Sequence, residues 1–327
     1  MRRERLGRPG PPADFQAGLA ADLAADGNRS VRMRVSGFTF IRNGARLNYP
    51  FVESIRSALP VVDEFVVAVG AGDDDTREQI VAIGDPKIRI VDTVWNPILV
   101  KRGFVLAQQK MIALYNCTGD WAFYIEGDEV LHEDDQAAVT AAMKRHHDNP
   151  EVEALWFDYR HFYGDVNWIT QTHSYYKREA RIIRNTIRVT TTDSLYFLVM
   201  DKKKRGRYPR AASSDARLFH YGNARSPLPM WHKRREMSQL YTATPETYPP
   251  PFHGITRQDA YTMDKRLIRR FEGTHPAVMA DWIASQEGDP YVPQYGAHNL
   301  REWRNLMGVR LNRFLPIDFS KKHFKPV

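Results

Sequence analysis

The sequence lacks the features that mark small secreted proteins and membrane-spanning proteins. Its 327 residues include one cysteine, Cys117, so no internal disulfide can form, and no Cys/His pattern has zinc-ligand spacing. No run approaches the roughly 18 apolar residues of a membrane span, and the basic N-terminus lacks the apolar segment of a secretory signal. Because 43% of the residues are hydrophobic, a sizeable core can form. We therefore expect a cytoplasmic globular protein that at most contacts the inner face of a membrane.

Acidic residues are outnumbered by basic ones. The chain has 47 Lys and Arg against 39 Asp and Glu, a net charge of +8. Much of the excess lies in short runs at residues 2–8, 202–207 and 233–235. A basic balance favours polyanionic partners such as nucleic acid, acidic lipid headgroups or phosphorylated small molecules, although such runs are most often solvated surface. Charge alone therefore does not identify the partner.

Strand-like and helix-like segments alternate about every 30 residues between residues 31 and 125. Residues 65–69 (FVVAV) and 121–125 (WAFYI) are apolar throughout, as in parallel strands buried on both faces. Between them, residues 51–59 and 104–114 place apolar side chains at helical spacing. This order predicts an α/β fold with an open mixed, mainly parallel sheet and helices on both faces.

Composition divides the chain into four predicted regions. Residues 1–30 are rich in Arg, Gly, Pro and Ala and are expected to form a flexible basic arm. Residues 31–150 carry the alternating strands and helices. The remaining regions are 151–235, which completes the sheet and forms an acceptor-side region, and 236–327, a helical and loop-rich C-terminal extension.

Acidic residues follow the first of the two apolar strands, in the segment GAGDDDT (70–76). A dinucleotide-binding loop is disfavoured here because Asp75 replaces its third glycine and three acids would repel a pyrophosphate. Small residues and acids at this end of a sheet could instead hydrogen-bond a ribose or a base. The alternative is a helix start with a solvated acidic turn.

A second acidic group, Glu126-Gly127-Asp128-Glu129, directly follows the other apolar strand. Carboxylates at alternate positions after a buried strand can project into the same opening at the sheet edge. Oxygen ligands of this kind suit Mg²⁺ or Mn²⁺, which complete their shells with substrate phosphates. Acids at helix starts are also common, so the group by itself is weak support for a metal site.

Several segments together resemble a bacterial family 2-type glycosyltransferase of the GT-A fold, over roughly residues 35–285. The segments are FTFIRNG (38–44), VDEFVVAVGAGDDDT (62–76), AQQKMIAL (107–114) and GDWAFYIEGDEVLHEDD (119–135). HYGNARSPLPMWHKR (220–234) and FEGTHPAVMADWI (271–283) are similar to stretches of one subgroup, which has x-x-Asp-Glu-x-x-His-Glu and His-Tyr-Gly motifs. The chain departs from the family at Gly70, where an Asp often stands, and at Gln109-Lys110, which replaces an Arg-Asn pair.

The resemblance implies transfer of a hexosyl or related sugar from a nucleotide diphosphate to a hydroxyl acceptor, a glycan, a lipid-linked molecule or another compound. It favours inversion and a Mg²⁺ or Mn²⁺ cofactor, and residues 31–150 would bind the nucleotide sugar. The principal metal contact would be Asp128, with Glu126 nearby, and Glu129 would cap the following helix. His220 would be a further metal or diphosphate ligand; the alternative is an ordinary hydrogen-bonded histidine. The residues implied for nucleotide-sugar binding are Thr39, Arg42, Asn43, Asp73, Asp74, Asp75, Glu126, Arg225 and Lys233.

Inversion also requires a carboxylate base for the acceptor hydroxyl. The acids between the metal motif and His220 include Asp158, Asp165, Asp193 and Asp215. Asp193 is favoured because TTDSLYF resembles a subgroup segment in which an acid follows a short strand; the alternative is a turn residue.

Two other functions remain open at this point. A nucleotidyltransferase could share the sheet and the acidic site, but FIRNGARL after the first strand matches a Gly-rich phosphate loop poorly. A basic nucleic-acid-binding protein would need basic residues interleaved with exposed aromatics on one face, and the acids at the predicted opening disfavour it.

Overall fold

The structure is a computed structural model that describes residues 32–99, 101–242, 254–296, 300–312 and 320–327. Residues Arg34–Val327 form one compact unit. The predicted basic arm, residues 1–30, lies outside the described residues. Within those that are described, no helix has the length and apolarity that crossing a membrane demands.

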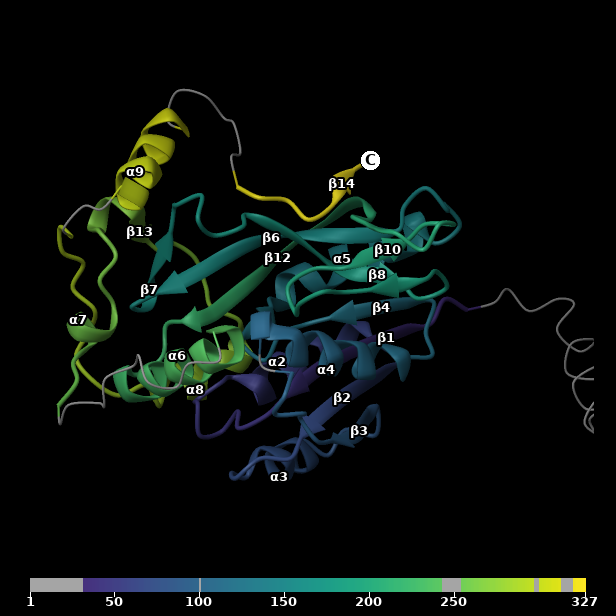
Figure 1. Ribbon diagram of the computed structural model, residues 1–327, viewed down its shortest axis with the longest axis horizontal. Coiled ribbons are helices and arrows are strands. Elements are labelled where there is room, and N and C mark those ends of the chain that lie inside the picture. Colours follow the sequence, from purple (N-terminus) through teal and green to yellow (C-terminus); the bar gives the residue numbers. More distant parts are fainter. Residues whose placement is uncertain (1–31, 100, 243–253, 297–299, 313–319) are drawn as a thin grey trace, which may run out of the picture. The chain divides into compact units, whose positions relative to one another are not determined.

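The core of the unit is an eleven-stranded sheet, counted over the described residues. Its main path has the order β13-β7-β6-β8-β4-β1-β2-β3 (Figure 1). The strands of this path are β1 (Val35–Ile41), β2 (Glu64–Gly70), β3 (Ile88–Thr93), β4 (Trp121–Tyr124), β6 (Ala154–Tyr163), β7 (Asp165–Thr170), β8 (Arg178–Arg184) and β13 (Ile268–Arg270). Strands β3, β2, β1 and β4 run parallel, whereas β8, β6, β7 and β13 pair antiparallel. The predicted open mixed α/β sheet is confirmed.

Strand β12 (Arg210–Asn223) branches from this path and brings the second half of the chain to the acidic turn after β4. It runs parallel to β6 on one side and antiparallel to β5 (Glu129–Leu131) on the other. In this register His220 lies opposite both Glu129 and His161. The remaining strands are β14 (Lys325–Pro326), which pairs with β12, and a small sheet of β9 (Val189–Thr190), β10 (Leu198–Met200) and β11 (Gly206–Arg207).

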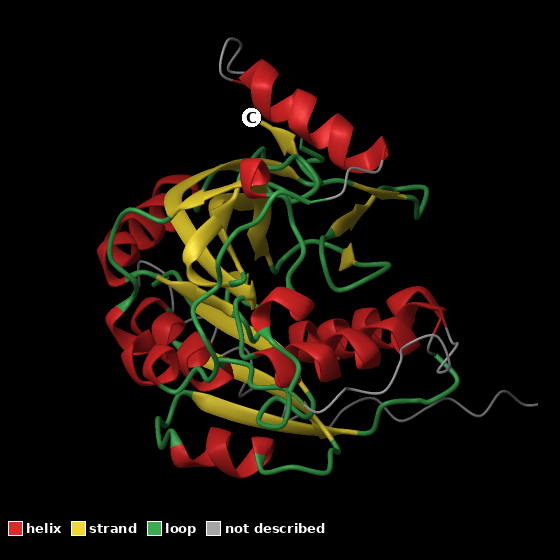
Figure 2. Ribbon diagram, turned by 90° about the vertical axis from the view of Figure 1, so that its left-hand side faces the viewer, coloured by secondary structure: helices red, strands yellow, loops and turns green. Residues whose placement is uncertain are grey.

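Helices cover both faces of the sheet (Figure 2). The predicted helices at 51–59 and 104–114 correspond to α2 and α4, and the strand at 65–69 lies in β2, whose residues Phe65–Gly70 are all buried. The helices are α2 (Phe51–Ala58), α3 (Thr76–Ala82), α4 (Phe104–Tyr115), α5 (Gln136–His146), α6 (Pro227–Thr242), α7 (Arg257–Ala260), α8 (Ala280–Ala284) and α9 (Leu300–Asn312). Short 3₁₀ turns are η1 (Leu59–Val61), η2 (Lys101–Gly103), η3 (Glu133–Asp135), η5 (Lys265–Leu267) and η6 (Ala277–Met279).

An aromatic cluster joins the C-terminal extension to strands β6 and β12 of the sheet. Phe162 of β6 stacks on Tyr221 of β12, with ring centroids 4.6 Å apart. Trp282 of α8 meets Tyr221 edge-on, and Met279 is fully buried in the same cluster. This burial ties the chain after α6 to the strand that carries His220.

Candidate active site

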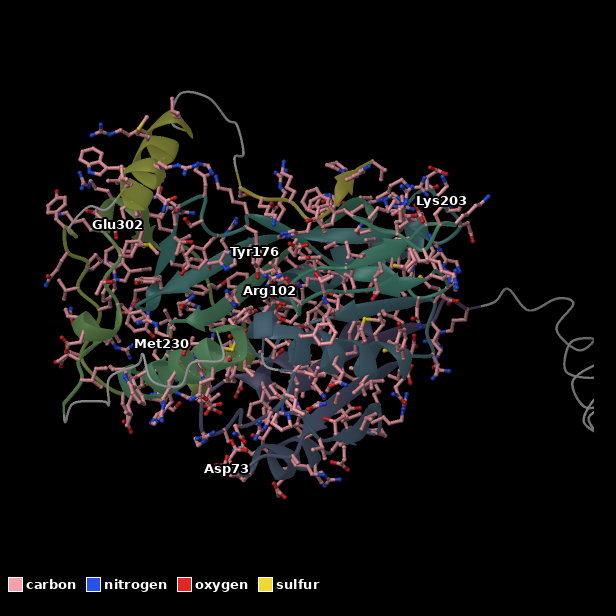
Figure 3. All side chains as sticks on the ribbon, in the orientation of Figure 1. Asp73, Arg102, Tyr176, Lys203, Met230 and Glu302 are labelled. Atoms are coloured by element: carbon pink, nitrogen blue, oxygen red, sulfur yellow. The ribbon has the colours of Figure 1, made fainter. Side chains whose placement is uncertain are left out.

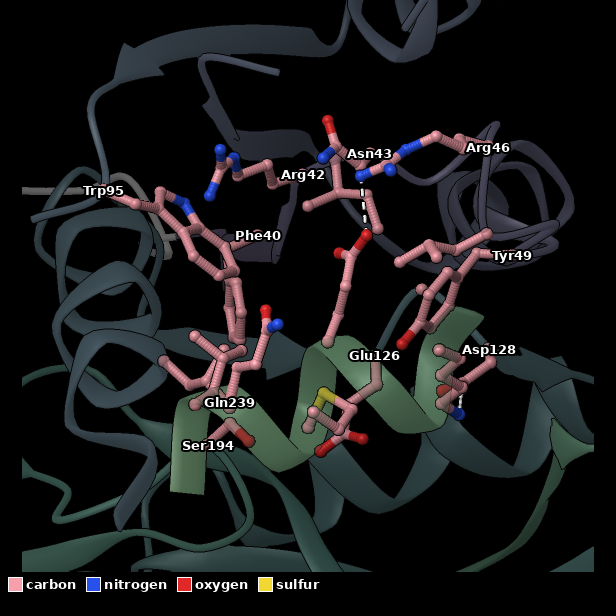
Figure 4. A pocket seen from close by; sticks show the side chains of 18 of the residues that line it. Phe40, Arg42, Asn43, Arg46, Tyr49, Trp95, Glu126, Asp128, Ser194 and Gln239 are labelled. Atoms are coloured by element: carbon pink, nitrogen blue, oxygen red, sulfur yellow. Dashed lines mark hydrogen bonds and ion pairs between the residues drawn. The ribbon is translucent and has the colours of Figure 1, made fainter. Parts of the chain in front are cut away.

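A cavity of about 370 Å³ opens where β1 and β4 end, against helix α6. Trp95 and Phe40 form one end of it, and Tyr49 and Asp128 the other (Figure 4). The lining residues are Phe40, Ile41, Arg42, Asn43, Arg46, Leu47, Tyr49, Trp95, Leu106, Tyr124, Glu126, Gly127, Asp128, Ser194, His220, Lys233, Glu236, Met237, Gln239 and Leu240. The cavity therefore contains six of the residues that the sequence indicated: Arg42, Asn43, Glu126, Asp128, His220 and Lys233.

The acidic turn between β4 and β5 supplies the carboxylates of the cavity. Glu126, Asp128 and His220 each offer one ligand atom, and these atoms lie within 4.8 Å of one another. The two acids come from a single short turn, while His220 arrives through the pairing of β12 with β5. Oxygen and imidazole donors at this separation suit a divalent cation such as Mn²⁺.

Asp128 is the most strongly charge-paired residue of the site. Its side chain is buried, and Oδ2 accepts hydrogen bonds from Lys233 Nζ at 2.9 Å and from Arg225 at 3.0 Å. Burial would raise the pKa of Asp128, but Lys233, His220 and Arg225 outweigh it and hold that pKa well below its usual range. Burial, and next the charge of Arg225, lowers the pKa of Lys233 to about 8. Asp128 is therefore ionised at neutral pH.

Arg225 lies behind Asp128, outside the lining of the cavity. It is fully buried, donates to the Leu47 carbonyl at 2.8 Å and has its guanidinium carbon 3.9 Å from the centre of the Tyr49 ring. These contacts fix the guanidinium so that it holds one oxygen of Asp128. The position fits a residue that orients Asp128 better than one that reaches a diphosphate.

Glu126 and Glu129 are joined by a buried arginine. Arg181 of β8 donates to Glu129 Oε1 at 2.6 Å and to Glu126 Oε1 at 3.0 Å. Glu129 is fully buried in β5, and its Oε2 accepts the Glu126 N–H, so the prediction that Glu129 caps a helix is wrong. Burial raises the pKa of Glu126 to about 7, with Arg181 opposing the shift and Glu129 and Asp128 adding to it.

A hydrogen bond between two histidines, His161 and His220, orients the His220 ring beside the carboxylates. His161 Nε2 lies 2.7 Å from the Tyr176 carbonyl oxygen and His161 Nδ1 lies 2.8 Å from His220 Nδ1. A carbonyl can only accept, so His161 Nε2 carries the proton, and burial followed by His220 lowers the pKa of His161 well below its usual range. Neutral His161 therefore accepts at Nδ1, and His220 donates from Nδ1.

The space beside His220 fits a bound cation. His220 Nε2 lies 3.5 Å from Asp128 Oδ1, and a cation between these two atoms would be held by both when Nε2 carries no proton. Adjacent ligands of an octahedral Mg²⁺ are about 3 Å apart, so the separation is compatible. At Gly222 an added Cβ would lie 2.5 Å from His220 Nε2 and 3.0 Å from Asp128 Oδ2, so glycine keeps this space open. The residues present therefore fit a divalent cation.

The predicted nucleoside loop is only partly at the cavity. Asn43 lines it, has a positive φ of 53° and accepts the Asp73 N–H through its side chain. Arg42 donates to the Ala71 carbonyl at 2.9 Å and extends over the Trp95 ring. Thr39 is buried beneath the cavity, and its Oγ1 has no hydrogen-bond partner within the described part of the chain.

The three consecutive acids lie outside the lining of this cavity. Asp73 is 70% exposed and faces Arg46 at 3.5 Å; Figure 3 shows it at the edge of the molecule near α3. Asp74 accepts the Arg46 N–H and the Thr76 hydroxyl, and Asp75 accepts from Gln79 of α3. The acids therefore connect the loop after β1 with the start of α3.

Trp95 occupies the place beside Gly70. An added Cβ on Gly70 would lie 2.3 Å from Trp95 Nε1, so any larger residue there would displace the indole. In the family that the sequence resembles, an Asp often stands at this position. Here an aromatic ring forms the wall instead, and no sequence motif pointed to Trp95.

Asp193 lies on the loop between β9 and β10, and Ser194 beside it lines the cavity. Its carboxylate accepts the Leu195 N–H at 2.8 Å. Lys110 Nζ anchors the loop through the carbonyls of Ser194 and Tyr196. A catalytic role for Asp193 stays a prediction.

The three other acids have surface or turn partners. Asp158 pairs with Arg178 at 3.0 Å, and Asp215 pairs with Arg145 at 2.7 Å. Asp165 accepts backbone N–H groups of Asn167 and Tyr291. The site residues that sequence reasoning missed are Arg46, Tyr49, Trp95, His161, Arg181 and Glu236.

No family model matches the chain, and no curated protein matches it. Among solved structures, glucosyl-3-phosphoglycerate synthase from Mycobacterium tuberculosis, in complex with Mn²⁺, UDP-glucose and phosphoglyceric acid, is similar at 19% identity and a TM-score of 0.29, over 47% of this chain and 50% of that one. S. aureus TarS is similar at 15% identity and a TM-score of 0.36, over 63% of this chain and 39% of that one. The 1–349 fragment of TarS is similar at 12% identity and a TM-score of 0.35, over 64% of this chain and 65% of that one. The chain thus spans about half the length of the synthase and from 39% to 65% of the two TarS chains.

Proposed function

We propose that the protein is a metal-dependent glycosyltransferase that moves a sugar from a nucleotide diphosphate to a hydroxyl acceptor. One observation carries the proposal: Glu126, Asp128 and His220 converge within 4.8 Å in a cavity at the strand ends, with Lys233 beside them. The sequence segments that form this site are those that resemble family 2-type glycosyltransferases. The fold and the position of the cavity agree with that resemblance.

The cavity has the size and polarity of a small-molecule site. Its volume of about 370 Å³ falls in the range of ligand pockets, which are mostly apolar with a few placed polar groups. Phe40 and Trp95 offer ring faces for a base, and Asn43 and Arg42 offer polar groups for a ribose. The nucleoside would therefore lie toward Trp95 and the diphosphate toward Asp128.

Asp128 and His220 would hold Mg²⁺ or Mn²⁺, with Glu126 beside them. When bound, the cation supplies neutralisation of the negative charge that develops on the departing diphosphate. Lys233 would pair with the diphosphate as a point charge, since its ammonium lies at the cavity and already contacts Asp128. Arg225 would keep Asp128 ionised and oriented from behind.

Transfer forms a bond between the acceptor oxygen and the anomeric carbon while the bond from that carbon to the diphosphate oxygen breaks. In an inverting reaction, the acceptor proton passes to a base, for which we propose Asp193. A hexosyl donor and a glycan, lipid-linked or other hydroxyl acceptor complete the proposal. No observation of the described residues favours a nucleotidyltransferase, and the acids in the cavity disfavour nucleic-acid binding.

Thermal shift measurements with UDP, GDP, dTDP and CMP, each with and without Mn²⁺, test the proposal. We expect one or two nucleoside diphosphates to raise the melting temperature, and only when Mn²⁺ is present. Asp128→Asn should lose that metal dependence, while Asp158→Asn, changed on the surface, should keep it. Shifts that are absent for every nucleotide, combined with single-strand binding that weakens steeply with salt, would favour the nucleic-acid reading.

A further inference from the structure

Helix α9 carries an exposed apolar stripe far from the candidate active site in the sequence. The exposed fractions are 86% for Leu300, 51% for Trp303, 59% for Met307 and 45% for Leu311. Their spacing of three or four residues places them on one side of the helix. The opposite side packs inward through Leu306 and Val309 against Leu267 of η5. The helix is thus anchored on one side and apolar on the other.

Cations border this stripe. Arg304 and Arg310 are exposed, and the 3.6-residue period puts them on either side of the stripe. The turn η5, which packs beneath α9, adds exposed Lys265, whose ammonium lies 3.7 Å from the centre of the Tyr295 ring. Tyr295 itself is 67% exposed. Aromatic and apolar side chains rimmed by Arg and Lys are typical of helices that lie in a membrane interface.

We propose that α9 and η5 form a docking surface for an anionic lipid bilayer. Leu300, Met307 and Leu311 would enter the boundary between headgroups and acyl chains, with Trp303 at headgroup level. Arg304, Arg310 and Lys265 would meet the lipid phosphates. The helix would lie on the membrane and not cross it.

Charge and chemistry favour a bilayer over the other occupants. A second copy docked stripe to stripe would bring like-charged rims together, because a two-fold interface applies the same patch twice. A nucleic acid would use the cations but leave the Leu and Met side chains against a polar backbone. An anionic bilayer matches both the charge and the apolar stripe. The proposal is independent of the sugar-transfer chemistry.

The test is co-sedimentation of the full chain with vesicles of phosphatidylcholine alone or mixed with phosphatidylglycerol. We expect binding to the anionic vesicles and at least tenfold weaker binding to the neutral ones. Since each interfacial Arg contributes about fivefold, Arg304→Gln with Arg310→Gln should weaken binding about thirtyfold. Leu300→Gln with Met307→Gln should weaken it at least tenfold, because two apolar side chains no longer enter the bilayer. These side chains are exposed, so folding should survive.

Matched controls change the same number of residues of the same kind elsewhere. Lys202→Gln with Lys203→Gln removes two exposed charges on the turn between β10 and β11, and Val81→Gln with Val94→Gln removes two exposed apolar side chains. Both controls should bind the anionic vesicles with an affinity within about threefold of the parent's. A threefold change is smaller than the effect of removing one interfacial charge. Equal losses in the charge control and in the α9 charge variant would reduce the effect to net charge and overturn the proposal.

Other outcomes also overturn it. If the parent protein does not bind anionic vesicles, or if the α9 variants bind them as tightly as the parent does, the surface does not contact a membrane. Sedimentation velocity that shows a dimer in the parent and a monomer in the Leu300→Gln, Met307→Gln variant would assign the stripe to a second copy. Equally tight binding of free single-stranded DNA, lost in the arginine variant alone, would assign it to nucleic acid.

Discussion

Two parallel strands of the sheet, β2 and β4, are each followed by a turn that carries acidic residues, and the two turns have opposite surroundings. After β2, Asp73 is 70% exposed and meets a single surface arginine, Arg46. After β4, Asp128 is buried and contacts Arg225 and Lys233, which follow 97 and 105 residues later in the chain. The acids after β4 form a candidate site because later segments of the chain bring a histidine and two opposite charges to them. The acids of the first turn contact Arg46 from the loop after β1 and Thr76 and Gln79 from α3, outside the lining of the cavity.

The largest difference between the two turns should appear in Asp128→Asn. Under the proposed function, removing the charge weakens a cation ligand, so we expect turnover to fall about 10³-fold and Mn²⁺-dependent nucleotide binding to vanish. Buried Arg225 also loses its counter-charge, so stability should fall by about 3 kcal/mol. Circular dichroism at the assay temperature verifies folding, and titration with Mn²⁺ reports the ligand loss separately. Asp73→Asn is the matched change in the other turn. Equal losses of turnover and of Mn²⁺-dependent nucleotide binding in both variants would show that the two turns contribute alike.

Asp193 belongs to neither acidic turn and probes whether the chemistry needs a third acid. A lost general base typically costs 10²–10⁴-fold in rate, so Asp193→Asn should transfer sugar at least ~10²-fold more slowly. Donor binding, followed by the Mn²⁺-dependent thermal shift, should stay within a few-fold of the parent since the base acts on the acceptor.

Asp158→Asn and Asp215→Asn serve as controls, because both acids form ion pairs on the surface. If one of these controls loses the rate and Asp193→Asn does not, the base is that acid. If all three variants keep their activity, a retaining reaction without this base becomes the better hypothesis.

A variant at His161 tests whether this residue positions His220, the proposed histidine ligand beside the β4 turn. His161→Phe removes the acceptor for His220 Nδ1–H, so His220 can take the other tautomer or rotate. Loss of such a supporting partner typically weakens metal affinity 10–100-fold, which Mn²⁺ titration followed by electron paramagnetic resonance measures.

The nitrogen chemical shifts of His220 give a readout that simple destabilisation would not produce. They should show a proton on Nδ1 in the parent and a changed pattern in His161→Phe. An unchanged His220 tautomer together with unchanged Mn²⁺ affinity would contradict the positioning role. His161→Gln, which can present an acceptor oxygen, should recover part of the affinity.

Much of the fold was legible in the sequence because it follows from local pattern. The apolar runs of β2 and β4 and the apolar face of α2 predicted buried parallel strands and their helices. The candidate cation site was predicted in part: Asp128 and His220 carried motif signals, whereas His161 and Arg181 did not. Their importance comes from the register of β6, β8 and β12, and nothing in the local sequence encodes that register. Glu129 illustrates the error that results, since a residue expected at a helix start is instead buried against Arg181.

Gly222→Ala, in β12, tests whether the space between His220 and Asp128 matters. The new Cβ would stand 2.5 Å from His220 Nε2, so the imidazole must shift away from Asp128. We expect about a tenfold loss of Mn²⁺ affinity, the lower end of the effect of disturbed ligand positioning. Gly206→Ala, on the small second sheet, should leave the affinity unchanged. Unaltered Mn²⁺ binding in Gly222→Ala would place the cation elsewhere in the cavity.

The smallest effect is expected in the first turn, at Asp74. Its Oδ1 accepts the Thr76 hydroxyl at 2.6 Å, and its Oδ2 accepts the Arg46 N–H at 2.8 Å, so the side chain ties the loop after β1 to the start of α3. Asp74→Asn replaces one acceptor oxygen by a donor and should cost about 1 kcal/mol, lowering the melting temperature by roughly 2–4 °C. Activity and Mn²⁺ affinity should change by less than about threefold, because Asp74 does not line the cavity and substitutions at separate sites couple weakly. Differential scanning calorimetry and Mn²⁺ titration of the same sample separate the two effects. A large loss of nucleotide binding with intact stability would show instead that the first turn contacts the nucleoside directly, and the two acidic turns would then form one site.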